Sequence, residues 1–396
     1  MKRPKAVILA GGIGRAFKPL ITNKTLIPFL GKPLLQHVIE MLEASSIQEA
    51  LIVTNQENEA WLASYQPFNI TLQTKCIEPN GMGDALLQAT EEIGAEPALV
   101  LNASDMIDPS FLKILLHSLD GKQACVTGLA VDTYFPGGYL KTDGDRATEI
   151  VEKPGAGNEP SNLINLVFHY FEQPQEFMEL LRRIDTKDDQ YEQALNTYMQ
   201  QKYVHVVKYH GAWAKLKYAY HVLDMTASML NTIKPHIART ATISKHAVLE
   251  GNVYVDEDAH IDDYAIIKGP AYIGKGTRVG NHSLVRQSTV EAGATVGFGS
   301  EIARSYIGPN CMLHHNFVGD TVLEASVNPS WGTTFTNWRL DGKDVKVKLG
   351  DKLMETGKEK LGAIVANGAF LGVNCSVMPG VTIEADKHIM PGSVVK

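Results

Sequence analysis

A short glycine-rich loop near the N-terminus is the first place in this sequence where residue types and spacing point to chemistry. Gly11, Gly12 and Gly14 follow the apolar residues 6–10, which read as a buried strand. The backbone amides of such a loop can cradle phosphate groups. The loop is not a Walker A motif, because no Gly-Lys-Ser/Thr follows, and Phe17 replaces the third glycine of the dinucleotide-binding motif. The alternative is a tight turn that binds no ligand.

The elements that would position this loop alternate in type from residue 1 to about residue 225. Short apolar runs, typical of buried strands, alternate with stretches whose apolar residues recur at helical spacing. This alternation predicts an α/β domain of parallel β-α-β units, with a sheet covered on both faces. The predicted strands are residues 6–10, 50–55, 98–104 and 124–131, and the predicted helices are residues 34–45, 83–94 and 111–119.

The second half of the chain follows a different period, of six residues. Each repeat carries an aliphatic residue, with a small or β-branched residue two positions before it. This period is the signature of a left-handed parallel β-helix built from hexapeptides, whose triangular coils each point aliphatic residues inward. The interval from about 303 to 362 lacks the pattern, which predicts an interruption where a site would lie. The aliphatic positions are Ile243, Leu249, Val255, Ile261, Ile267, Ile273, Val279, Val285, Val290, Val296, Ile302, Val365, Leu371, Val377, Ile383, Ile389 and Val395.

These patterns divide the chain into a first domain (1–225), a linker (226–238) and a β-helix domain (239–396). Residues 223–233 read as a short linking helix that ends before Pro235.

Composition excludes several classes of function. The chain has 37 basic and 44 acidic residues, so no global positive field attracts nucleic acid. No apolar stretch of about 18 residues predicts a membrane span. The 4 cysteines are far apart, which argues against a disulfide framework or a cysteine-rich zinc site and predicts a cytoplasmic protein.

Several motifs in the first half, taken in order, resemble those of the sugar-1-phosphate nucleotidylyltransferases. They are LAGGIGRAFKPL (9–20), GKPLLQHVIEML (31–42), NGMGDAL (80–86), Ser104-Asp105 and GluLysPro (152–154). The resemblance implies a Rossmann-like domain that binds a nucleoside triphosphate and a sugar-1-phosphate, and joins them by in-line attack on the α-phosphate. It makes Lys24 the catalytic lysine and Asp105 a ligand of Mg²⁺. The implied substrate-binding residues are Gly11, Gly12, Gly14, Arg15, Gly81, Gly83, Glu152, Lys153 and Asn165.

Two departures from that family concern the phosphate and metal sites. Ala16 replaces the arginine of the signature, and Lys215 replaces a second metal-binding aspartate. A charged lysine cannot ligate Mg²⁺. Two interpretations follow: a damaged metal site, or a fixed cation that supplies part of the charge of the metal. Mg²⁺ is therefore expected only if this site is active.

Motifs in the second half resemble those of the glucosamine-1-phosphate acetyltransferases. The matching segments are residues 267–286, 314–320 (HHNFVGD), 328–337 (NPSWGTTFTN), 360–363 (KLGA) and 372–381. The resemblance makes His314 the general base, Arg286 the cation that holds the sugar phosphate, and Asn328 and Asn337 the groups that hold the thioester. Acetyl-CoA is the implied co-substrate. The neighbouring His315 is the alternative base.

Four functions remain open from the sequence. The first is the archaeal-type bifunctional enzyme, with both transfers, on the route to UDP-N-acetylglucosamine. The second keeps only the acetyltransferase. The third is a non-catalytic, sugar-nucleotide-binding regulatory subunit, and the fourth is a nucleotidylyltransferase whose β-helix regulates or oligomerises. The flat sides of a triangular solenoid predict a homotrimer or a dimer of trimers, with sites between subunits, as the resemblance also implies. The nucleobase, the sugar and the acyl group stay undetermined.

Overall fold

The structure, a computed structural model, describes residues 3–12, 14–185, 189–349 and 352–396. The chain forms two compact units. The first consists of residues 1–13 and 35–213, and the second of residues 14–34 and 214–396. The second compact unit therefore includes a short N-terminal segment, residues 14–34, together with the second half of the chain. The ranges 1–225, 226–238 and 239–396 follow chain order instead, and they stay a prediction.

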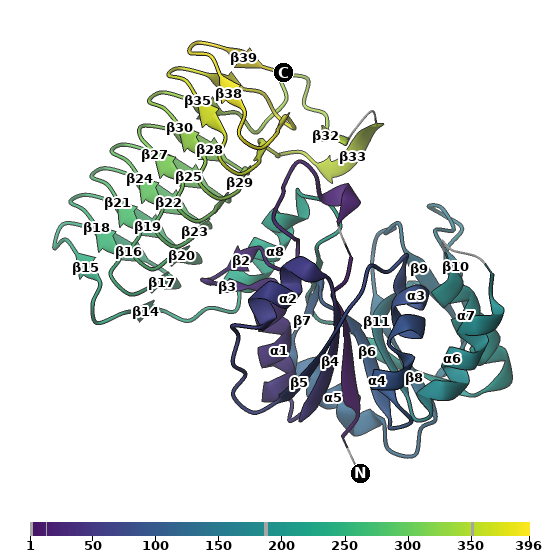
Figure 1. Ribbon diagram of the computed structural model, residues 1–396. Coiled ribbons are helices and arrows are strands. Elements are labelled where there is room, and N and C mark those ends of the chain that lie inside the picture. The colour runs from purple at the N-terminus through teal and green to yellow at the C-terminus, as the bar shows by residue number, and fades with distance from the viewer. Residues whose placement is uncertain (1–2, 13, 186–188, 350–351) are drawn as a thin grey trace. The chain divides into compact units, whose positions relative to one another are not determined.

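The first unit contains a mixed β-sheet with helices on both sides (Figure 1). Strands β5, β4, β1 and β6 are parallel, and so are β8 and β12. In spatial order, the strands among the described residues are β5 (Thr71–Cys76), β4 (Glu49–Thr54), β1 (Lys5–Leu9), β6 (Ala98–Asn102), β11 (Leu163–Phe171), β8 (Ala124–Ala130), β12 (Val204–Tyr209), β10 (Arg146–Glu152) and β9 (Gly138–Asp143).

The four predicted strands are confirmed, and β1, β4 and β6 pair in parallel as expected, but the sheet as a whole is mixed. Strand β11 runs antiparallel to both β6 and β8, and β9 and β10 pair antiparallel with each other. The chain passes from β8 through β9 and β10 to β11 without a helix. Parallel neighbours need a crossover connection, usually a helix, so this stretch returns antiparallel.

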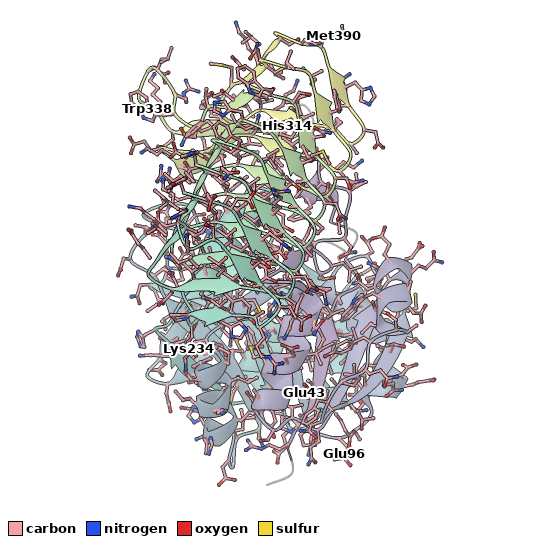
Figure 2. The ribbon with its side chains drawn as sticks, turned by 90° about the vertical axis from the view of Figure 1, so that its left-hand side faces the viewer. Glu43, Glu96, Lys234, His314, Trp338 and Met390 are labelled. Atoms are coloured by element: carbon pink, nitrogen blue, oxygen red, sulfur yellow. The ribbon has the colours of Figure 1, made fainter. Side chains whose placement is uncertain are left out.

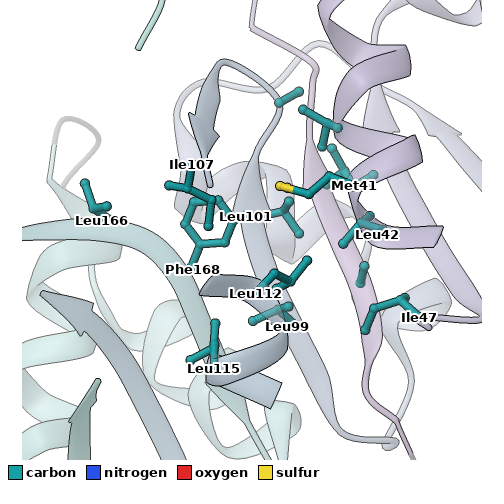
Figure 3. Packing of buried hydrophobic residues seen from close by; sticks show 14 of the residues in the cluster. Met41, Leu42, Ile47, Leu99, Leu101, Ile107, Leu112, Leu115, Leu166 and Phe168 are labelled. Atoms are coloured by element: carbon teal, nitrogen blue, oxygen red, sulfur yellow. The ribbon is translucent and has the colours of Figure 1, made fainter. Parts of the chain in front are cut away.

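Helices cover both faces of this sheet because side chains alternate along its strands. Ala6 and Ile8 of β1 join the core formed with α1, α2 and α5, whereas Val7 joins the core with α3, α4, α6 and α7. Figure 3 shows side chains of α1 and α5 gathered around Leu99 and Leu101 of β6. The helices of the chain's described part are α1 (Leu34–Ala44), α2 (Gln56–Leu62), α3 (Met82–Gln88), α4 (Thr90–Ile93), α5 (Pro109–Ser118), α6 (Pro174–Arg183), α7 (Gln190–Gln201) and α8 (His221–Leu230).

The predicted helices are confirmed, with one division. Residues 83–94 form α3 and α4, because Ala89 between them leaves the helical conformation, with φ of −104° and ψ of 13°. The linking helix predicted at 223–233 is α8, in the second unit. No described helix combines the length and apolar character needed to cross a membrane.

The second unit contains a parallel β-helix, whose strands stack as successive coils in green to yellow in Figure 1. Its inward residues, such as Val255, Ile273 and Val296, are fully buried, which confirms the period of six. We call the three sides of the β-helix face 1, face 2 and face 3. Face 1 consists of β14 (His236–Ile237), β17 (Val253–Val255), β20 (Ala271–Ile273), β23 (Thr289–Val290), β26 (Tyr306–Ile307), β29 (Val322–Leu323), β34 (Ile364–Val365) and β37 (Thr382–Ile383). Face 2 consists of two successive sheets. The first contains β15 (Thr242–Ile243), β18 (His260–Ile261), β21 (Arg278–Val279), β24 (Thr295–Val296) and β27 (Met312–Leu313), and the second contains β30 (Asn328–Pro329), β35 (Phe370–Leu371) and β38 (His388–Ile389). Face 3 consists of β16 (Val248–Glu250), β19 (Ile266–Lys268), β22 (Leu284–Arg286), β25 (Glu301–Ala303), β28 (Phe317–Gly319), β31 (Thr334–Phe335), β36 (Ser376–Val377) and β39 (Val394–Val395).

The interruption predicted between 303 and 362 is shorter than expected. Coils continue through β31, and the chain leaves the solenoid only after Asn337, whose carbonyl accepts a hydrogen bond from the returning Leu361 amide at 3.0 Å. An antiparallel hairpin, β32 (Val345–Leu349) and β33 (Lys352–Lys358), occupies the excursion. The period is hidden before it because steps between inward residues shorten from six to five, as from Val318 to Leu323.

The remaining short elements link these parts. The second unit includes a 3₁₀ turn, Arg15–Phe17, and the hairpin of β2 (Pro28–Phe29) and β3 (Lys32–Pro33). Strand β7 (Asp105–Ile107) belongs to the first unit, and β13 (Trp213–Lys215) spans the boundary between the two.

Candidate functional site

The glycine-rich loop and the loop that begins at Pro79 lie against each other in the first unit. A Cβ on Gly11 would lie 2.9 Å from Cγ of Pro79, so only glycine allows this approach. Gly12 is exposed, and a Cβ there would meet nothing within 4 Å. Gly81 follows Pro79 by two residues. The glycine-rich loop is thus brought against the segment that leads to the NGMGDAL motif (80–86).

Two asparagines that the sequence did not single out hold the glycine-rich loop. The Asn58 side chain is fully buried, and its Nδ2 donates to the Ala10 carbonyl at 2.8 Å. The Nδ2 of Asn55 lies 3.4 Å from the Gly11 carbonyl. Asn55 also caps α2, since its Oδ1 accepts from the Asn58 amide. The N-cap pattern before α2 was the available signal for this role.

The two glycines of the NGMGDAL motif, Gly81 and Gly83, differ in role. Gly81 precedes α3 with φ of 99°, a conformation that favours glycine. A Cβ on Gly83 would lie 2.6 Å from Oε1 of Gln190, at the start of α7. A glycine at position 83 therefore allows α3 to pack closely against α7, and this packing is sufficient to explain why the residue is glycine.

Asp105 has an uncompensated carboxylate oxygen. Its side chain is buried, with 1% exposed. The Oδ2 atom accepts from the side-chain Nδ2 of Asn102 at 3.3 Å, but Oδ1 is buried and has no partner among the described residues. Strand β6, which precedes Asp105, pairs with β1, which precedes the glycine loop. Asp105 and the glycine loop thus follow the ends of two adjacent parallel strands.

This carboxylate fits a magnesium ion that arrives with a triphosphate. Mg²⁺ usually keeps several waters and takes only one or two carboxylates together with substrate phosphates. A buried anionic oxygen without a donor is costly, and a cation would satisfy it. Among the described residues, no cluster of three or more His, Cys, Asp or Glu side chains could hold a metal by itself.

The predicted sugar-binding residues Glu152 and Asn165 lie together with Gly138. Gly138 pairs with Glu152 across β9 and β10, and a Cβ on Gly138 would lie 2.8 Å from Oε2 of Glu152. The same Cβ would lie 3.9 Å from Cβ of Asn165. Lys153 adopts φ of 46°, and its Nζ is 3.5 Å from Oε1 of Glu152, in a half-exposed ion pair. The absence of a side chain at Gly138 leaves room for the carboxylate of Glu152.

Asn165 is oriented by a buried histidine, which the sequence did not single out. The Oδ1 of Asn165 accepts from Nε2 of His169 at 3.0 Å, and the Tyr191 hydroxyl donates to Nδ1 at 2.7 Å. Burial lowers the pKa of His169 to about 3, so the imidazole is neutral near pH 7, and the tautomer with its proton on Nε2 satisfies both partners. The amide nitrogen of Asn165 is thereby turned away from His169.

We expect His169 to make stability depend on acid pH. Its pKa in the folded chain lies below the unfolded value of about 6.5, so the unfolded state binds the proton first and stability falls as pH drops below about 6.5. At pH 5 the loss is roughly 2 kcal/mol. Urea unfolding measures the free energy of unfolding at pH 7 and at pH 5. The loss between the two pH values should be smaller in His169→Gln than in the wild type, by about 2 kcal/mol. Equal losses in both proteins would exclude this role of His169.

Lys24, Gly14 and Arg15 belong to the second unit. Lys24 is half-buried within a turn, where Oδ1 of Asn23 accepts from the Thr25 amide at 3.1 Å. The Arg15 side chain lies outside the described residues. Lys215, which the resemblance predicts to replace a metal-binding aspartate, is a half-buried residue at the end of β13.

The two adjacent histidines of the β-helix have different surroundings. His315 stacks between Phe298 and Trp331, with ring centroids 6.2 and 5.5 Å away, and its Nδ1 lies 3.0 Å from the Phe298 carbonyl. His314 follows β27 and is exposed. Figure 2 shows His314 on the coils, well apart from Trp338 at the start of the excursion. The stacked ring of His315 leaves His314 as the better candidate base.

The other predicted acetyltransferase residues lie on two faces. Asn328 opens β30 on face 2, one coil beyond His314, and its Oδ1 is buried without a partner in the described part of the chain. Arg286 lies on face 3, where its Nη2 is 2.8 Å from Oε1 of Glu301. Asn337 follows β31 of the same face. His314 and Asn328 thus lie on successive coils of face 2, and Arg286 forms an ion pair with Glu301 on face 3.

A second charged group lies where face 3 turns towards face 1. Arg304 makes a bidentate pair with Asp320, at 2.7 and 2.6 Å, and Nδ2 of Asn337 donates to the same carboxylate at 2.6 Å. A cavity of about 320 Å³ beside this group is also lined by Thr226 of α8 and by Lys358. Arg304 is therefore engaged by Asp320.

The fold and the first site define a class of protein. A family model described as nucleotidyl transferase matches residues 5–215. Two solved structures of UDP-glucose pyrophosphorylase share the fold of this region. The apo structure gives a TM-score of 0.53 at 19% identity, and covers 58% of this chain and 98% of that one. The UDP-glucose complex gives 0.51 at 20% identity, and covers 58% and 99%. The first half is a nucleotidyl transferase domain.

Relatives extend this likeness over the whole chain. A bifunctional GlmU protein of Methanocaldococcus jannaschii is 31% identical, over 96% of this chain and 92% of its own length. One from Methanococcus maripaludis is 32% identical, over 97% and 92%. A bifunctional sugar-1-phosphate nucleotidylyltransferase/acetyltransferase of Sulfurisphaera tokodaii is 28% identical, over 99% and 97%. The chain therefore belongs to the family of bifunctional GlmU transferases.

Proposed function

We propose that this protein carries two transferase activities. The nucleotidyl transferase domain joins a nucleoside triphosphate to a sugar-1-phosphate and releases pyrophosphate. The β-helix transfers the acetyl group of acetyl-CoA to the amine of glucosamine-1-phosphate. Full-length similarity to bifunctional relatives supports the combination.

The observation that carries the nucleotidylyl half is the unpartnered oxygen of Asp105. A phosphate oxygen of the sugar phosphate attacks the α-phosphorus, and the bond from that phosphorus to pyrophosphate breaks. Backbone amides of the glycine loop hold the triphosphate, and Lys24 offsets its charge. Asp105 would hold Mg²⁺, which when bound neutralises charge on the phosphates. Glu152 and Asn165 orient the sugar.

The acetyl half uses His314 as the general base. His314 accepts a proton from the sugar amine as the new nitrogen–carbon bond forms at the thioester carbon. The carbon–sulfur bond breaks, and CoA leaves as a thiolate that takes up a proton. Arg286 binds the sugar phosphate, and Asn328 and Asn337 hydrogen-bond the thioester oxygen.

One incubation tests both halves. The protein is mixed with glucosamine-1-phosphate, acetyl-CoA, UTP and Mg²⁺, and CoA thiol and pyrophosphate are measured separately. Release of both supports the proposal. Thiol alone leaves an acetyltransferase with an inactive first domain, and pyrophosphate alone makes the β-helix silent in catalysis. Release of neither rejects the proposal for these substrates.

A second candidate, acetyl transfer alone, is favoured by one specific observation. Lys215 stands where the family carries a second carboxylate, so Asp105 would hold the metal without that partner. Thiol release without pyrophosphate at saturating Mg²⁺ would select this candidate.

We further propose a homotrimer or a dimer of trimers in the cytoplasm. His314 and Asn328 lie on face 2, whereas Arg286 lies on face 3. A neighbouring copy that packs its face 3 against face 2 would complete the set. The unpaired state of the 4 cysteines is compatible with a reducing compartment. Light scattering after gel filtration should give three or six times 43.4 kDa, and a monomer would exclude the assembly.

A further inference from the structure

A short N-terminal segment, residues 21–31, is clamped onto face 1 of the β-helix. We call it the clamped segment. It belongs to the same compact unit as the β-helix, although some 260 to 300 residues separate it from its partners there. Two glutamates of face 1, Glu291 and Glu324, hold its two ends.

Glu324 holds the beginning of the clamped segment. Its side chain is 2% exposed. Oε1 accepts from the Thr22 amide at 2.7 Å and from the Ile21 amide at 3.1 Å. Oε2 accepts from the Asn367 amide of the next coil at 2.8 Å. The carboxylate thus joins the segment to two coils of the solenoid.

Glu291 holds the end of the clamped segment. Its side chain is fully buried. Oε1 accepts from the Leu30 amide and Oε2 from the Gly31 amide, both at 2.9 Å, and the Thr289 hydroxyl adds a third bond at 3.0 Å. Gly31 fits this place because it adopts φ of 81°, and a Cβ there would lie 2.5 Å from the Tyr272 hydroxyl oxygen.

Tyr306 contacts the clamped segment between the two glutamates. Its hydroxyl donates to the Pro28 carbonyl at 2.9 Å, and its ring lies 5.7 Å from that of Phe29. Tyr306 is on β26, the coil between Glu291 and Glu324. Three successive coils therefore contact one short segment.

Stability alone does not explain Glu291. Burial, aided by the nearby Asp256 carboxylate, raises its pKa to about 7, although the three donated hydrogen bonds oppose that shift. A folded pKa above the unfolded value means that ionisation on raising the pH through 7 costs the folded state free energy. The ionised Glu291 carboxylate therefore costs folding free energy at neutral pH. It nevertheless accepts hydrogen bonds from two backbone amides of the clamped segment. We take this as evidence that the conformation of the clamped segment is required for function.

Lys24 lies between the two clamped ends, and the proposed function requires it to have an accurate position beside a triphosphate. Asn23 tightens the turn that carries it, because its Oδ1 accepts from both the amide and the hydroxyl of Thr25, at 3.1 and 2.9 Å. The ends of the loop are thus fixed to the solenoid, and its centre is fixed by a local turn.

We propose that Glu291 and Glu324 are positioning residues for nucleotidylyl transfer, which hold the segment that carries Lys24 on face 1 of the β-helix. The β-helix would then contribute to the reaction of the first domain as well as to its own. This inference rests on the proposed nucleotidylyl activity. Neither glutamate contacts the reacting atoms in this proposal, since both act through Lys24.

The test compares Glu291→Gln and Glu324→Gln in the full chain. Glutamine keeps the size of the side chain, but its amide group opposes a backbone donor. We expect kcat for pyrophosphate release from UTP and N-acetylglucosamine-1-phosphate to fall between about 10- and 100-fold, with KM for UTP changed less than about threefold. Thiol release by the β-helix should stay at the wild-type rate, which shows that the solenoid is folded. The matched control is Glu257→Gln, which removes an exposed ion pair with Lys275.

A double substitution separates positioning from general damage. In a Lys24→Ala background, Glu324→Gln should cause no further loss, because the positioned group is gone. A further loss equal to that of the single variant would overturn the route through Lys24. Glutamine variants within threefold of wild type would overturn this inference and leave the proposed function intact, whereas a wild-type protein that releases no pyrophosphate would overturn both.

Discussion

The His314→Ala variant is expected to lose acetyl transfer while it still binds acetyl-CoA. A positioned base that accepts the amine proton contributes about 10²- to 10⁴-fold to such a reaction, so thiol release should fall by that factor. Binding of acetyl-CoA should change little, because the thioester is assigned to Asn328 and Asn337 instead. Thiol release measured with glucosamine-1-phosphate, together with calorimetric binding of acetyl-CoA, checks both parts.

His315→Ala is the matched control, because it removes the same side chain from the next position. Its ring is held between Phe298 and Trp331, and its Nδ1 faces the Phe298 carbonyl. We expect a loss of less than about tenfold, from disturbed packing. Unchanged turnover in His314→Ala would refute the assignment of the base, and a large loss confined to His315→Ala would transfer the role to His315.

The β-helix was predictable because its geometry imposes one local rule on every coil. Each inward position must be aliphatic, and that rule repeats at a fixed spacing that a single sequence reveals. The prediction followed one shortened step, from Val285 to Val290, but failed where such steps recur, from Ile302 to Ile307 and again from Leu313 through Val318 to Leu323. Those coils are regular in the structure, but their spacing no longer matches the period. The excursion after Asn337 was placed too early for this reason.

The site was predictable where a motif is local and not where partners are distant. The glycine loop and Asp105 each follow a strand, so their placement at strand ends could be read from the sequence. The antiparallel direction of β11 depends on which strands it pairs with in the folded sheet, and the hydrogen bond between Asn165 and His169 depends on the tertiary structure around it. Glu291 and Glu324 were missed because outward positions of a solenoid are usually solvated, and nothing near them in sequence shows that amides of residues 21–31 cover them.

The largest expected effect in the first domain is that of Asp105→Asn. Its Oδ1 is buried without a donor, and Lys215 stands in place of the family's second carboxylate, so removing the charge should remove the anchor for Mg²⁺. Pyrophosphate release should fall by about 10²-fold or more, the equivalent of roughly 3 kcal/mol. The free energy of unfolding should stay equal or rise, because an uncompensated buried charge has been removed. Pyrophosphate assays and urea unfolding of the same preparation measure both.

Asp108→Asn is the control for this prediction. Asp108 differs from Asp105 because its side chain is exposed and because its Oδ1 accepts a hydrogen bond. Asp108 is exposed and caps α5, where its Oδ1 accepts from the Ser110 amide at 2.8 Å. Asparagine caps helices about as well, so neither activity nor stability should change appreciably. Loss of activity together with loss of stability in Asp105→Asn would mean that the carboxylate supports the fold. Loss of activity without loss of stability, absent from Asp108→Asn, would mean that the chain accepts a buried charge at Asp105 because its ligand compensates it.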